Sequence, residues 1–197
     1  MANLISLGVA TAFLVMIPGP NVALIVANSI RYGFRMGGIT VLGTTLGVAL
    51  QLAAVVAGMT ALVAAAADAL TWIRWAGVVY LVYLGVRTWN EPTRDLSEVV
   101  AAPAVFWRGC LIAAVNPKTL LFNAAFLPQF VVDDAGVGGQ LALIAAVFLG
   151  VLLLGDMIWA MTASSARPLL DRYGSARNRL TGGFLIAAGV GLALSRR

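Results

Sequence analysis

The sequence predicts an all-α membrane protein that consists of six transmembrane helices. Of its 197 residues, 61% are hydrophobic and only 11% are charged, whereas charged residues make up about a quarter of a soluble domain. The length of the chain fits about six spans of roughly 20 residues each. The six stretches lie near residues 3–30, 38–67, 70–90, 108–132, 139–166 and 180–195.

Proline interrupts the first and the fourth stretch. The first contains Pro18-Gly19-Pro20-Asn21 and the fourth contains Asn116-Pro117-Lys118. Proline lacks a backbone donor and clashes with the preceding turn, so both helices must break. In hydrocarbon, the freed carbonyl groups need hydrogen-bond partners, which only protein groups or a water-filled cavity can provide. Broken helices at corresponding places in two halves indicate the binding site of a secondary transporter.

The layout predicts one transmembrane domain over residues 1–197, built as two inverted three-helix repeats with broken first and fourth helices. Repeat one covers about residues 1–90, a linker about 91–107, and repeat two about 108–197. Arginines concentrate after the first, third and fifth stretches, and the positive-inside rule then places the amino terminus outside. The first stretch lacks a basic leading region, so we do not expect a cleaved signal.

The second stretch carries a stripe of small and polar residues at helical spacing. Thr40, Thr44, Gly47 and Gln51 lie on one face, and Gly43 and Gly47 form a GxxxG pattern. Small residues allow close packing of helices in lipid, either within the chain or in a homodimer. The bulky amide of Gln51 instead favours a position at a cavity.

Four polar or broken features share one predicted depth. Pro20, Lys118 and Asp156 each lie about ten residues from a predicted cytoplasmic arginine, which corresponds to roughly 15 Å and hence to the middle of the bilayer. Gln51 falls close to the same level. Either charge alone costs about 2.5–3.5 kcal/mol at this depth, so we expect Lys118 and Asp156 to approach one another or to reach one cavity. A static salt bridge between two helices is the alternative.

Composition excludes several other classes of protein. One cysteine permits no intrachain disulfide, and the absence of histidine removes the commonest metal ligand and general base. No sequence motif of a hydrolase, a metalloprotease or a phosphate-binding loop is found. We therefore expect neither an enzyme nor a cofactor, a metal site or a nucleic-acid partner.

A family resemblance covers nearly the whole chain. Pro18-Gly19-Pro20-Asn21 followed by glycines and an arginine resembles the opening signature of the LysE/RhtB family of amino-acid exporters, and Asn116-Pro117-Lys118 looks like its fourth-span motif. The further matching residues are Gly33, Arg35, Gly37, Gly43, Gly47, Gly77, Tyr80, Leu81, Leu84, Gly85 and Phe126 to Phe130. The resemblance implies a multi-pass exporter of amino acids or small amines in the bacterial plasma (inner) membrane, driven by the proton gradient.

These observations predict a substrate site near the bilayer midplane and a residue that carries the coupling proton. Half-helix amino termini with Lys118 would attract a substrate carboxylate, and freed carbonyls with side-chain amides would take the ammonium. Asp156 would exchange the proton. A passive facilitator and a structural membrane subunit remain as alternatives. The predicted substrate-binding residues are Pro18, Gly19, Pro20, Asn21, Gln51, Asn116, Pro117, Lys118 and Asn123.

Overall fold

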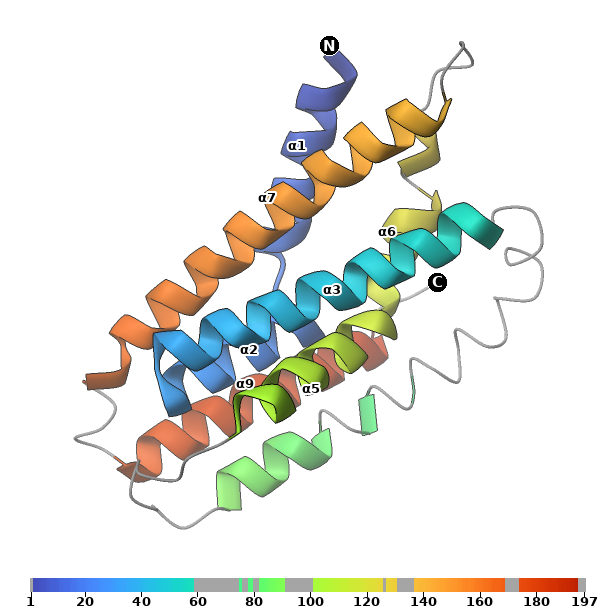
Figure 1. The fold of residues 1–197 in the computed structure, drawn as a ribbon. Helices are drawn as coiled ribbons and strands as arrows, with labels where there is room; N and C mark the ends of the chain where they lie inside the picture. The colour runs from blue at the N-terminus through green and yellow to red at the C-terminus, as the bar shows by residue number, and fades with distance from the viewer. Residues whose placement is uncertain are drawn as a thin grey trace.

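The computed structural model describes residues 2–58, 75, 78–79, 82–90, 101–125, 127–130, 137–168 and 174–194, and every regular element in these ranges is helical (Figure 1). A further helical segment covers residues 82–90. The named helices are α1 (Ala2–Met16), α2 (Pro20–Tyr32), α3 (Phe34–Gly58), α5 (Ala102–Ala114), α6 (Pro117–Ala125), the 3-10 helix η1 (Leu127–Phe130), α7 (Val137–Ser165) and α9 (Gly174–Leu194).

Both predicted helix breaks are present. α1 ends at Met16 and α2 begins at Pro20, and the two axes differ by 59°. α5 ends at Ala114 and α6 begins at Pro117. Proline therefore occupies the first position of both second half-helices, where its missing N–H leaves no hydrogen bond unmade.

The described helices are apolar and long enough to account for two or three membrane spans. α3 supplies Phe34–Val55 and α7 supplies Gly139–Ser165, and the bent pair α1–α2 makes a third if it crosses as one unit. α5 is a shorter apolar helix. The coarse prediction of an all-α membrane protein agrees with this architecture. The count of six spans stays a prediction, because much of the third stretch lies outside the described residues.

α2 lies at the centre of the helix assembly. Its residues from Pro20 to Ile30 are all buried, and it packs against α3, α5, α7 and α9. In Figure 1, α2 lies behind α3 and beside α9. α2 is therefore buried from its first residue, whereas Met16, Ile17 and Pro18 on the other side of the first break are exposed.

The GxxxG face of α3 packs against α5. A side-chain carbon added at Gly43 would lie 3.0 Å from the backbone carbon of Phe106, and one added at Gly109 would lie 2.9 Å from the backbone oxygen of Thr40. Close helix packing within the chain, one of the two predicted uses of this face, is therefore observed. The same face is covered by α5 and is not available to a second copy.

Candidate functional site

The two helix breaks meet through a pair of asparagine side chains. Nδ2 of Asn116, just before α6, donates a hydrogen bond of 2.9 Å to Oδ1 of Asn21 in the first turn of α2. Oδ1 of Asn116 accepts the backbone N–H of Lys118 at 3.1 Å and so caps α6. Both asparagines are buried. One side chain therefore both starts a half-helix and joins it to the other break.

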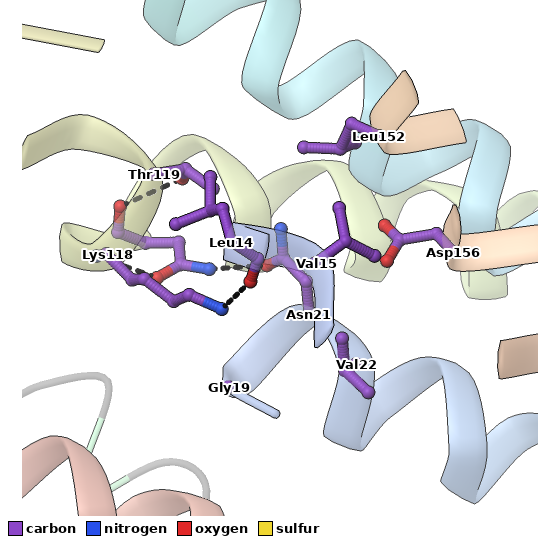
Figure 2. Close-up of a pocket in the computed structure, with 10 residues that line it drawn as sticks. Leu14, Val15, Gly19, Asn21, Val22, Lys118, Thr119, Leu152 and Asp156 are labelled. Carbon is purple, nitrogen blue, oxygen red and sulfur yellow. Dashed lines mark hydrogen bonds between the residues drawn. The ribbon is translucent and has the colours of Figure 1, made fainter. Parts of the chain in front are cut away.

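Lys118 is bonded to the broken end of α1. Its Nζ atom donates to the backbone oxygens of Leu14 and Ile17, and Figure 2 shows the bond to Leu14. The Leu14 oxygen has no helical partner because the residue four positions later, Pro18, has no N–H. A cation at the carboxyl end of a helix also interacts favourably with the helix dipole. Lys118 thus stabilises the end of α1.

A second donor reaches the same helix end from α7. Nε1 of Trp159 donates to the backbone oxygen of Val15 at 3.1 Å. Successive carbonyl groups at the end of α1 are therefore satisfied by side chains from two other helices. This arrangement fixes the end of α1 between α6 and α7.

Gln51 joins α3 to the second break. Its Nε2 atom donates to the backbone oxygen of Asn116 at 2.9 Å, and its Oε1 atom accepts the hydroxyl of Thr119 at 2.8 Å. Only 4% of Gln51 is exposed. Gln51 therefore contacts the residues of the break and satisfies their polar groups.

Asp156 faces a small pocket between the two breaks. The residue is 2% exposed and lies on α7, and no donor among the described residues bonds its carboxylate. Figure 2 shows Lys118 and Asp156 at opposite ends of the group of lining residues, with Val15 and Asn21 between them. In the described part of the chain no salt bridge joins Lys118 to Asp156. The two charges reach one pocket, as one of the two predicted arrangements requires.

The pocket is lined by both broken helices and by α7. Its volume is about 20 Å³, enough for roughly one water molecule. Polar and aliphatic residues both contribute to its lining. The lining residues are Leu14, Val15, Gly19, Asn21, Val22, Asn116, Lys118, Thr119, Leu152 and Asp156.

Half of the predicted site residues line this pocket and half do not. Gly19, Asn21, Asn116, Lys118 and Asp156 do. Of the others, Pro20 and Pro117 are buried at the helix starts, Pro18 is exposed, and Gln51 is bonded to the second break. Asn123 is fully buried, and neither of its amide atoms has a hydrogen-bond partner.

Sequence reasoning missed the aliphatic and hydroxyl part of the lining. One signal was available for Leu14, because it lies four residues before Pro18 and so carries a carbonyl that proline leaves unpaired. Thr119 directly follows Lys118 in the second break. No sequence signal distinguishes Val15 or Leu152 from the many other aliphatic residues of apolar helices.

Broken apolar helices that meet at a small pocket with two opposite charges are typical of secondary transporters. A comparison with known protein families also indicates a membrane transporter. The chain belongs to the family of LysE type translocators, whose family model matches residues 12–196. It is therefore a membrane transporter and not an enzyme.

Several bacterial proteins are similar to this chain over most of its length. An uncharacterized membrane protein of Bacillus subtilis, YrhP, is 25% identical over 93% of this chain and 95% of its own. A leucine efflux protein of Klebsiella pneumoniae is 27% identical over 90% and 85%. A cysteine/O-acetylserine efflux protein of Escherichia coli is 26% identical over 85% and 86%. No solved structure matches the chain.

Proposed function

We propose that this protein exports amino acids or related small amines from the cytoplasm by exchange for protons, through the pocket between the two breaks. The observation that carries the proposal is the presence of Lys118 and Asp156 in one pocket that both broken helices line. The names of the leucine and the cysteine/O-acetylserine efflux relatives support the substrate class. The proposed location is the bacterial inner membrane, with the amino terminus outside.

The amino terminus of α2 is suited to the substrate carboxylate. The backbone N–H groups of Asn21 and Val22 have no acceptor within the helix, and both residues line the pocket. The helix dipole adds a partial positive charge at this end. Lys118 adds a full charge, so this end of the pocket favours an anion.

The acceptor groups of the pocket are suited to the substrate ammonium. Leu14, whose carbonyl group lies at the end of α1, and Asp156, with its carboxylate, both line the pocket. An ammonium has three donors and no acceptor, so a site of carbonyl and carboxylate oxygens matches it. An α-amino acid would therefore bind with its carboxylate towards α2 and its ammonium towards α1.

A pocket of about 20 Å³ must widen before it holds an amino acid. Relative motion of the two halves, as in other transporters with broken helices, would widen it towards one side of the membrane at a time. A pocket this small in the empty protein favours such a cycle over a permanently open channel. Asp156 would bind the proton on the outer side and release it inside.

Proteoliposomes test the transport function directly. Vesicles are preloaded with a radiolabelled amino-acid panel that includes leucine and cysteine, and efflux is measured with and without an acidic external medium. We expect faster efflux with the proton gradient. Efflux that follows the substrate gradient alone identifies a passive facilitator. Efflux equal to that of protein-free vesicles means that the protein does not transport these compounds, and a structural membrane subunit is then the remaining alternative.

Two variants test the residues. Lys118→Ala should abolish efflux while the protein still inserts into the membrane, and Leu121→Ala on the same helix, at a side chain that is 58% exposed, should leave efflux unchanged. Asp156→Asn should retain efflux down a substrate gradient but lose its acceleration by the proton gradient. Wild-type acceleration in Asp156→Asn assigns the coupling proton to another group.

A further inference from the structure

The carbonyl groups at the end of α1 form a site for one primary ammonium. Leu14 and Ile17 direct their backbone oxygens to a single Nζ atom, at the negative end of a helix dipole. The stem of Lys118 runs along Gly19, where an added side-chain carbon would lie 3.3 Å from Cδ and 3.8 Å from Nζ. Glycine therefore leaves the path of this stem free of side-chain atoms.

The occupant of this site is carried on a flexible chain. Lysine has a four-carbon stem with a strongly hydrated terminal charge, so Nζ can leave the carbonyls if another acceptor receives it. Asp156 lines the same pocket, and no donor among the described residues bonds its carboxylate. The pocket thus contains one cation on a flexible stem and two groups that can accept its hydrogen bonds, the α1 carbonyls and Asp156.

We propose that Lys118 occupies, in the empty transporter, the subsite that takes the substrate's ammonium, and that a bound substrate displaces Nζ from the α1 carbonyls to Asp156. The proposal rests on the proposed function and specifies the ligand class of that site as primary ammonium compounds. A substrate ammonium has the same three donors as Nζ and can replace it bond for bond.

The exchange also gives the proton a defined path. In the empty protein Nζ is held by the α1 carbonyls, and Asp156 can bind a proton from outside. When a substrate from the cytoplasm displaces Nζ, the arriving cation favours the carboxylate form of Asp156, and the proton leaves to the inside. Release of the substrate outside returns Nζ to α1, so one proton enters for each substrate exported.

The vacated subsite can be probed without knowledge of the substrate. The probes are n-butylammonium and 1-butanol, and the readout is the unfolding midpoint of wild-type protein, Lys118→Ala and Leu121→Ala in nanodiscs. We expect n-butylammonium to stabilise Lys118→Ala at a concentration on the order of tenfold lower than it needs for the other two proteins. 1-Butanol should not do so. Equal responses of the three proteins, or of the two probes, overturn the proposal.

A second measurement uses the wild-type protein and therefore does not depend on the folding of a variant. Lys118 is the only lysine of the chain, so protein labelled with 13Cε and 15Nζ lysine gives one lysine side-chain signal. An amino acid that the vesicle assay finds exported should move this signal further than the same compound without its amine does.

The two proposals fail in different ways. An exported amino acid that leaves the lysine signal in place overturns the displacement of Lys118 and leaves the transport function standing. If no amino acid of the panel is exported, the proposed function fails. The n-butylammonium measurement then still decides whether the α1 carbonyls bind an ammonium.

Discussion

Gly47→Ala tests whether backbone contact between α3 and α5 holds the two halves together. A side-chain carbon at Gly47 would lie 2.8 Å from Cβ of Ala113 and 2.9 Å from the backbone nitrogen of Ala114, and closer still to the backbone oxygen of Cys110. None of these atoms can rotate away, so the helices must separate by roughly 1 Å. Such overpacking reduces the free energy of unfolding by about 1–3 kcal/mol. For a chain of this size that lowers the unfolding midpoint by about 2–12 °C.

The measurement is thermal unfolding of the purified protein in detergent, with Gly150→Ala as the control. Gly150 lies on α7, and an added carbon there meets nothing within 4 Å. Alanine is the better helix former by about 1 kcal/mol, so this control should be as stable as the wild type or more stable. If Gly47→Ala unfolds at the temperature of Gly150→Ala or above it, the contact between the two backbones does not limit stability.

Three further variants test single features of the site and its surroundings. Gln51→Leu keeps the size of the side chain but removes its hydrogen bonds to Asn116 and Thr119. It should lower the free energy of unfolding by about 1 kcal/mol and slow efflux. An unchanged unfolding midpoint and efflux rate contradict a role of Gln51 at the break. Gly33→Ala places a side chain at φ 84° and ψ 177°, a region open essentially to glycine, and should destabilise by about 1–3 kcal/mol, measured by unfolding. Trp159→Phe removes the donor to Val15 and should lower the unfolding midpoint by an amount equivalent to about 1 kcal/mol, whereas no change shows that the bond adds nothing.

The positions of the helix breaks could be predicted because proline acts through local chemistry. Pro18, Pro20 and Pro117 each remove a donor wherever the rest of the chain lies, and the structure contains a break at both places. Lys118 and Asp156, which the sequence predicts to approach one another or to reach one cavity, both line the pocket. The positions of the breaks follow from a property that a short segment carries by itself.

The partners of these residues could not be predicted in the same way. Gln51 was expected at a cavity, and instead it bonds to Asn116 on a segment 65 positions away. Lys118 was expected to face a substrate, and in the structure its ammonium is bonded to backbone oxygens of Leu14 and Ile17, about a hundred positions earlier in the chain. Such contacts depend on how helices cross, and an apolar pattern does not specify the crossing.

The residues of the site come from both halves of the chain, so a relative movement of the halves would change the surroundings of the Lys118 and Asp156 charges. Lys118 on α6 and Asp156 on α7 both belong to the second half, whereas Leu14, Ile17 and Asn21 belong to the first. A movement of one half against the other would therefore change the bonds from Nζ to α1 together with the space in front of Asp156. In the proposed exchange, displacement of Nζ by a substrate also releases the end of α1, so the pocket would open on that side when the cation leaves. A transporter built in this way would link the arrival of a substrate ammonium, the release of α1 and the loss of a proton in one step.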